Sequence, residues 1–214
     1  RAGRHTNDGS FGTTGQCENL SADEIEKIEK HELNGINMVY WRNSDLNFDS
    51  LEKLNTSLEK KPDFDFFKRI NDCEDEKILK LLTKSENKIE INNTKDTIQT
   101  LWECCQIPDF SKKAYGNHIE IVKRVFEFLT SKTGKVTNDY MKKQLQHLDR
   151  YEGNIDTLAN RISNVRTWSY VANKKGWANN SDYWIERTKY IEDMLSDKLH
   201  EELTKSFVDK RISI

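Results

Sequence analysis

Apolar side chains recur at spacings of three and four residues along most of this chain, which is the repeat of one face of an α-helix. Only two prolines and nine glycines interrupt its 214 residues. Lys, Glu and Leu are abundant, and these side chains lose little rotamer freedom in a helix. We therefore predict a mainly α protein, built as one domain or as one domain and a small neighbour.

The spacing predicts a series of helices separated by short connections. Ser21 followed by Glu24 forms a capping-box pattern at the start of the first helix, and Pro62 ends another. Short extended segments are expected at residues 10–14 and 36–41, and a polar stretch at residues 84–93 marks the expected internal boundary. The expected helices cover residues 21–33, 49–60, 64–71, 75–83, 94–106, 118–130, 138–148, 155–172 and 182–208.

The residue types that build metal sites and hydrolytic sites are scattered. Cys17, Cys73, Cys104 and Cys105 form no CxxC pair, so we expect buried free thiols in a reducing, intracellular compartment. None of the five histidines belongs to an HExxH pattern, and the sequence contains neither a Walker A loop nor a DExH box. We therefore expect no metal site. No stretch approaches the ~20 apolar residues that a membrane span needs.

Positive charge is concentrated in one part of the sequence. Residues 111–176 carry 13 Lys and Arg and 6 Asp and Glu, a net charge of +7, which leaves −9 for the rest of a chain whose total is −2. Such a concentration is typical of a surface that binds phosphate backbones. The alternative is a solvated helical surface without a ligand, and the charge taken alone favours that alternative.

The chain begins with Arg1-Ala2-Gly3-Arg4, a glycine-containing turn between two arginines. Forked guanidinium groups on such a turn suit phosphate oxygens. The tetrapeptide resembles the second half of the QxxGRxGR motif of two-lobed DExH helicases, whose final arginines contact the terminal phosphates of the nucleotide. The Gln and the first Gly of that motif would lie before residue 1, so we expect the chain to be a C-terminal fragment of a longer helicase.

The resemblance extends along nearly the whole chain, to the RNA helicases of the mitochondrial degradosome type and their bacterial relatives. Residues 7–15 resemble the final strand of the second RecA-like lobe in that family. Further similar segments are 40–43 (YWRN), 101–110 (LWECCQIPDF), 164–173 (NVRTWSYVAN), 195–201 (LSDKLHE) and 207–211 (FVDKR).

The resemblance implies an ATP-driven 3′-to-5′ unwinding activity in the full-length parent, with ATP and Mg²⁺ as cofactors there and none in this fragment alone. Arg4 would be the arginine finger that stabilises charge on the γ-phosphate, and Arg1 and Gly3 would help to hold the nucleotide. The chain would divide into the end of the second RecA-like lobe (residues 1–16), a helical connector (17–92) and an all-α C-terminal domain (93–214).

The same resemblance predicts the partners and the compartment. The partners are the upstream helicase lobes, a single strand of nucleic acid with RNA favoured over DNA, and a nuclease, with no membrane involved. The compartment is the cytoplasm of a bacterium or the mitochondrial matrix.

Two groups of residues are candidates for contact with a nucleic-acid strand. Tyr40, Trp41 and Arg42 combine a stacking surface with a cation, although an aromatic hinge packed inside the protein is the favoured alternative. Arg161 and Arg166 lie five residues apart, about 140° around a helix, so they are not expected to form one clamp.

Three functions remain open from the sequence. The leading hypothesis is the C-terminal part of an ATP-dependent helicase that supplies the arginine motif and a helical module for holding a strand. A second is a helical module that binds RNA or a protein without catalysis. A third is a structural brace for the catalytic lobes.

Overall fold

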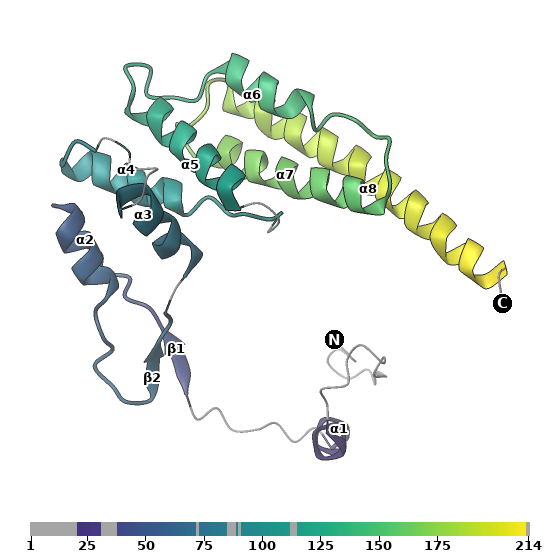
Figure 1. Ribbon diagram of the computed structural model, residues 1–214, viewed down its shortest axis with the longest axis horizontal. Helices are drawn as coiled ribbons and strands as arrows, with labels where there is room; N and C mark the ends of the chain where they lie inside the picture. The colour runs from purple at the N-terminus through teal and green to yellow at the C-terminus, as the bar shows by residue number, and fades with distance from the viewer. Residues whose placement is uncertain are drawn as a thin grey trace. The chain divides into compact units, whose positions relative to one another are not determined.

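The computed structural model describes residues 21–30, 38–71, 73–84, 89, 91–111 and 115–212. Eight helices and one two-stranded parallel sheet make up the regular structure of this part of the chain (Figure 1). The prediction of a mainly α fold is therefore confirmed. The strand expected at residues 10–14 lies outside the described residues, as do Arg1, Gly3 and Arg4.

The chain divides into two compact units. The smaller one comprises Arg1–Trp41 and Pro62–Lys68, and the larger one comprises Arg42–Lys61 and Arg69–Ile214. The chain crosses between the units next to residues 41, 61 and 68.

In the smaller unit, helix α1 (Ala22–Glu29) begins with the capping box that the sequence predicts. The backbone N–H of Ser21 donates to Oε2 of Glu24 at 2.8 Å, and the backbone N–H of Glu24 donates to Oγ of Ser21 at 3.3 Å. These two bonds satisfy N–H groups that the first turn of a helix leaves without a partner. The backbone hydrogen bond from Ser21 is the main cause that lowers the pKa of Glu24.

The helix predicted at residues 64–71 is wrong. The segment forms a turn and then strand β2 (Phe67–Arg69), which lies beside β1 (Val39–Trp41). The backbone N–H of Val39 donates to the carbonyl oxygen of Phe66 at 3.0 Å. The physical reason is that β1 offers the backbone partners that a short helix after Pro62 would have to supply itself, and of the three phenylalanines only Phe67 lies in the strand.

The larger unit contains seven helices in the part of the chain that the structure describes, and all seven are among those predicted. Four of them begin at the caps Ser50, Thr94, Thr137 and Asn154, each of which accepts a hydrogen bond from the backbone N–H three residues later. The helices are α2 (Leu51–Leu58), α3 (Glu74–Lys84), α4 (Lys95–Cys105), α5 (Tyr115–Thr130), α6 (Asn138–Gln146), α7 (Ile155–Asn173) and α8 (Ser181–Ile212).

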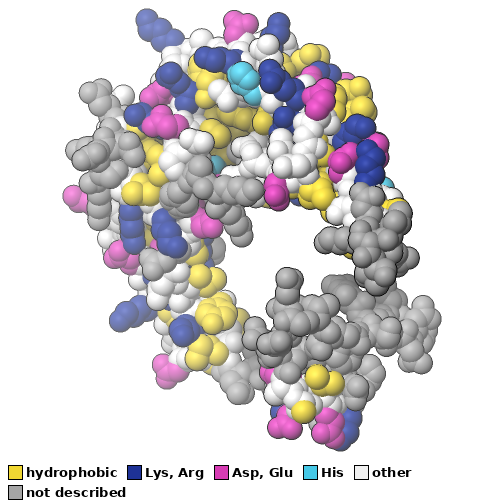
Figure 2. All heavy atoms as spheres, turned by 45° about the vertical axis from the view of Figure 1, so that its right-hand side comes forward, with side chains coloured by type: hydrophobic (Ala, Val, Ile, Leu, Met, Phe, Trp, Pro, Cys, Tyr) yellow, Lys and Arg dark blue, Asp and Glu magenta, His cyan; other side chains and the backbone are white. Residues whose placement is uncertain are grey.

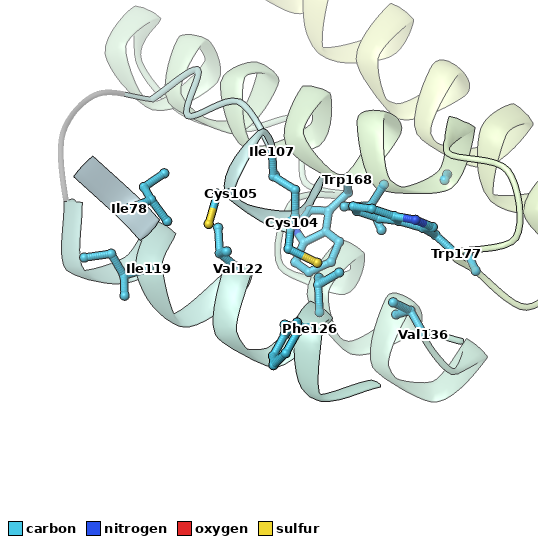
Figure 3. Packing of buried hydrophobic residues seen from close by; sticks show 14 of the residues in the cluster. Ile78, Cys104, Cys105, Ile107, Ile119, Val122, Phe126, Val136, Trp168 and Trp177 are labelled. Atoms are coloured by element: carbon cyan, nitrogen blue, oxygen red, sulfur yellow. The ribbon is translucent and has the colours of Figure 1, made fainter. Parts of the chain in front are cut away.

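The core of the larger unit contains two of the four thiols. Cys104 and Cys105 are almost fully buried, and Figure 3 shows them among apolar side chains from several helices. Burial is the main cause that raises the pKa of both thiols. The prediction of buried free thiols is confirmed for this pair, whereas Cys73 is partly exposed and Cys17 lies outside the described residues.

Helices α7 and α8 pack along each other, and α8 then continues beyond the other helices of its unit (Figure 1). Val165 and Trp168 of α7 and Ile191 and Leu195 of α8 are buried between the helices of the unit. An isolated parallel bridge joins the loop before α6 to the loop before α8, with the N–H of Val136 bound to the oxygen of Trp177 at 2.7 Å. These contacts fix the beginnings of α6 and α8 next to each other.

Candidate nucleic-acid interface

Arg42 is bound by the protein itself. Its Nη1 and Nη2 atoms donate to the two carboxylate oxygens of Asp75 at 2.8 and 2.9 Å, and Nη2 lies 3.5 Å from the carboxylate of Glu76. The guanidinium stacks 5.2 Å above the ring centre of Trp102. A guanidinium group is not free to bind a phosphate when both of its terminal nitrogens are bonded to a carboxylate and its face lies on an indole ring.

A second arginine reaches one of these carboxylates, that of Glu76. Nη2 of Arg69 lies 3.0 Å from Glu76, and Nε donates to the carbonyl oxygen of Leu58 at 3.0 Å. Glu76 is 4% exposed, and among the described residues its Oε1 atom has no hydrogen-bond partner. We call Arg42, Arg69, Asp75 and Glu76 the arginine clamp.

The arginine clamp lies where the chain returns to the larger unit. Arg42 directly follows Trp41, and Arg69 directly follows Lys68, which are the last residues of the two segments of the smaller unit. Sequence reasoning missed Arg69, Asp75 and Glu76 because Lys, Arg, Asp and Glu make up 33% of the chain, so most charged neighbours carry no signal. Only the fold brings these four residues together.

The ring of Tyr40 is exposed enough for a base to stack on it. Its side chain is 67% exposed on β1, and Trp41 is partly buried. Arg42 stacks on Trp102 and not on either neighbour, so the three residues do not form the combined cation and stacking surface that their sequence suggests.

Arg161 and Arg166 both lie on α7 and contact different partners, in agreement with their separation around the helix. Nη1 of Arg161 donates to the carbonyl oxygen of Arg150 at 2.8 Å, which fastens the loop before α7 to the helix. Nε of Arg166 donates to Oε1 of Glu192 on α8 at 2.7 Å. The structure does not bring these two arginines together.

Between α5 and α7 runs a hollow that is rich in amide side chains, which we call the amide groove. It consists of two neighbouring cavities of about 420 and 380 Å³ that share Asn117, Ile121 and Asn164. The other residues lining it are Asp109, Ser111, His118, Glu120, Arg124, Tyr140, Gln144, His147, Leu148, Asn154, Asp156, Thr157, Asn160, Thr167 and Trp168.

The bottom of the amide groove is held by two hydrogen bonds to the connection between α4 and α5. Nε2 of His118 lies 3.0 Å from the carbonyl oxygen of Ile107, and because a carbonyl only accepts, this nitrogen carries the proton. Oγ1 of Thr167 donates to the carbonyl oxygen of Pro108 at 3.1 Å. Burial is the main cause that lowers the pKa of His118, so its ring is neutral at pH 7.

A larger hollow of about 560 Å³ lies between α6 and α8, and we call it the α6–α8 cavity. Leu145, Trp184 and Ile191 are its buried apolar residues, and the exposed ring of Tyr183 also lines it. The remaining lining residues are polar or charged: Asn138, Asp139, Lys142, Gln146, Asp149, Asn180 and Arg187.

Several groups in the α6–α8 cavity are held by each other. The indole N–H of Trp184 donates to Oδ1 of Asn138 at 2.9 Å. Asp149 accepts from Arg187 and from the hydroxyl of Tyr151, and burial together with that hydrogen bond raises the pKa of Tyr151 to about 12. The cavity is therefore a preformed hollow with fixed walls.

Among the described residues of 111–176, the cations visible on one face of the molecule do not form a single stripe. On the face drawn in Figure 2, Lys and Arg side chains are interspersed with acidic ones. Arg124 pairs with Glu127, and Lys174 lies over the rings of Tyr170 and Trp177. The lysines that are exposed and have no ion-pair partner in the described part of the chain include Lys142, Lys143 and Lys175.

Within the described ranges, no three His, Cys, Asp or Glu side chains are grouped so that they could hold a metal ion. No helix of this part of the chain is long and apolar enough to cross a membrane. A comparison with protein-family models, with curated proteins and with solved structures gives no match to this chain. The likeness to degradosome-type helicases therefore stays a prediction from the sequence.

The first prediction concerns the arginine clamp. Arg42→Met removes the partner of Asp75 and leaves partly buried carboxylates, so we expect the free energy of unfolding to fall by about 2–4 kcal/mol. Urea denaturation followed by circular dichroism measures it. The control is Arg124→Met, whose ion pair with Glu127 is exposed and is expected to contribute less than ~1 kcal/mol. Equal losses in the two variants would contradict a stabilising clamp.

The second prediction concerns His118. Because its pKa is lower in the folded chain than the ~6.5 of an unfolded one, the unfolded state binds more protons at acid pH. The free energy of unfolding is therefore expected to fall as the pH drops below about 6.5. His118→Asn should flatten this dependence and the exposed His147→Asn should not. Parallel pH profiles for the two variants would show that His118 is not the group responsible.

Proposed function

We propose that this chain is the C-terminal part of an ATP-dependent DExH helicase. The end of its second RecA-like lobe would supply an arginine motif for ATP hydrolysis, and the helical part would help to hold a single strand of RNA or DNA. The other parts of the ATP site and the Mg²⁺ ion would belong to the upstream lobes of the parent. The protein would work in the bacterial cytoplasm or the mitochondrial matrix, with a nuclease as a further partner.

One observation supports this proposal more than any other. Three of the segments that resemble the family lie far apart in the sequence and contact each other in the structure. Arg42 of segment 40–43 stacks on Trp102 of segment 101–110. Thr167 of segment 164–173 donates to Pro108 of segment 101–110. If the resemblance had arisen by chance, we would not expect the similar segments to contain residues that pack on one another.

These contacts also explain why such segments would be similar between relatives. Trp102, Cys104 and Trp168 are buried in one core, so their sizes and shapes are fixed by the packing around them. Figure 3 shows Cys104 and Trp168 in this core. Arg42 is fixed by two hydrogen bonds and a ring. The shared residues would therefore preserve a fold that a helicase adds after its second lobe.

The arginine motif would act through charge. In the proposed parent, the guanidinium of Arg4 would lie against the γ-phosphate and stabilise the charge that develops as the bond to the leaving group lengthens. Arg1 would hold the phosphates from the same side, and Gly3 would let the backbone approach them. The fragment would supply these side chains to a site completed by the upstream lobes, so it would not hydrolyse ATP alone.

The third prediction tests this role in the full-length parent. Arg4→Ala is expected to lower ATP turnover by ~10³-fold or more, because that is the typical contribution of an arginine finger. Steady-state phosphate release in the presence of a single strand measures it. Arg124→Ala, which removes an exposed arginine of the larger unit, is the control. Wild-type turnover in Arg4→Ala would exclude the finger assignment.

A second function is favoured by one specific observation. Arg42, Arg161 and Arg166, three of the residues that the sequence offers as strand contacts, are bound by other groups of the protein. This is the pattern of a structural brace, in which arginines tie helices and loops together. A brace would stabilise the catalytic lobes without touching the strand.

The fourth prediction separates the two functions. A strand-holding chain is expected to bind labelled single-stranded RNA with an affinity that falls as salt rises, with a log–log slope of about −0.7 per neutralised phosphate. Charge reversal at Lys142, Lys143, Lys174 and Lys175 should weaken binding and make the slope shallower. Fluorescence anisotropy at low and moderate salt measures both quantities. If the chain does not bind RNA even at low salt, the brace is the better account.

A further inference from the structure

We propose that the α6–α8 cavity receives one unpaired base of a single nucleic-acid strand, with Tyr183 as the stacking surface and Lys142 as the phosphate contact. This inference deepens the strand-holding role proposed above and rests on it. It assigns that role to Tyr183, which sequence reasoning did not choose, and to one of the lysines of the fourth prediction.

The size and the apolar surface of the cavity fit a base. Its volume of about 560 Å³ lies within the range of roughly 300–1,000 Å³ that is usual for small-ligand pockets. Leu145, Trp184 and Ile191 are at most 5% exposed, and they form apolar walls against which a flat ring can lie. Because these walls are already almost fully buried, the hydrophobic gain on binding would come mainly from the surface of the base itself and from the exposed ring of Tyr183.

Tyr183 provides the aromatic face. Its side chain is 58% exposed although its neighbour Trp184 is buried, and the two rings meet edge to face with centroids 4.8 Å apart at an angle of 77°. Contact with Trp184 on one side orients the Tyr183 ring while much of its surface remains in water. A base stacked on that surface would be held without regard to sequence, because every base has an aromatic face.

The polar groups of the cavity can bond the edge of a base. Asn138 uses Oδ1 to accept from Trp184, which leaves its amide N–H groups available. Gln146 and Asn180 also line the cavity and add donors and acceptors of both kinds. Four of the cavity's lining groups are charged: Lys142 and Asp139 on α6, Asp149 after it, and Arg187 on α8.

The four charges sum to zero, which suits a neutral ring inside the cavity, and Lys142 is the cation that a phosphate at the edge could reach. Asp149 is neutralised by Arg187 and also binds Tyr151, so this part of the wall carries little net charge. Lys142 is exposed and has no ion-pair partner among the described residues, and Lys143 follows it. A strand whose base enters the cavity would place its backbone phosphate near Lys142 on α6, where a flexible ammonium can follow it.

The test compares four variants of the full chain in binding a labelled 12-nucleotide oligouridine by fluorescence anisotropy. Tyr183→Ala is expected to weaken binding about tenfold, which is the usual effect of losing one stacked base. Phe207→Ala is the matched control, since Phe207 is an exposed aromatic residue on the same helix but does not line the cavity. Lys142→Ala should weaken binding and reduce the salt slope more than Lys143→Ala, because only Lys142 lines the cavity.

A second measurement locates the base directly and does not depend on the folding of a variant. Oligouridine with 4-thiouridine is crosslinked by light to the wild-type chain, and the modified peptide is identified by mass spectrometry. We expect the crosslink on the α8 segment that contains Tyr183 and Trp184. Crosslinks confined to other segments would overturn the proposal. Competition by uridine monophosphate at the concentration of the oligonucleotide would also overturn it, because the site would then be a mononucleotide pocket.

The outcomes distinguish this inference from the proposed function. If the wild-type chain binds oligouridine and Tyr183→Ala binds as well as Phe207→Ala, the cavity assignment fails while the strand-holding role stands. If the wild-type chain does not bind at low salt, both the strand-holding role and the cavity assignment fail.

Discussion

The larger unit depends on the burial of helix α7. Leu158, Val165 and Val171 are fully buried along this helix, and Trp168 packs edge to face on Tyr140 of α6 with ring centroids 5.7 Å apart. Seven of the 19 residues of α7 are buried and they are spread over more than half of its circumference, so α7 must be covered from more than one direction. The amide groove is a consequence, because it forms beside α7 where the neighbouring helices do not fill the space.

Most helices could be predicted because their apolar stripes and their caps agree. Thr94 begins a stripe that Ile98, Leu101 and Cys105 continue, and all three are buried in α4. The segment 64–71 was predicted wrongly because its three phenylalanines fit a short helix as well as a strand. The segment forms a strand because it pairs with β1. That strand lies 28 residues earlier, so the pattern of residues within the segment does not reveal the pairing.

The candidate site could be predicted only in part. The excess of positive charge in residues 111–176 is present in the sequence, but it does not say which cations are already paired. Arg42 was a reasonable strand contact until the structure placed Asp75 and Trp102 around it. Lys142 and Tyr183 are 41 residues apart on different helices, so only the packing of α6 against α8 brings them to one cavity.

The arginines and the lysines of the larger unit have different roles, and the chemistry of their side chains explains the difference. The rigid guanidinium fork suits fixed partners, and Arg42, Arg69, Arg161 and Arg166 are used for carboxylates and carbonyl oxygens within the protein. Exposed lysines such as Lys142 and Lys143 keep their charge available on flexible stems. A surface of this kind would hold a backbone loosely and without a preferred register. That property suits a strand that has to move past the module, whereas a fork fixed on each phosphate would resist the movement.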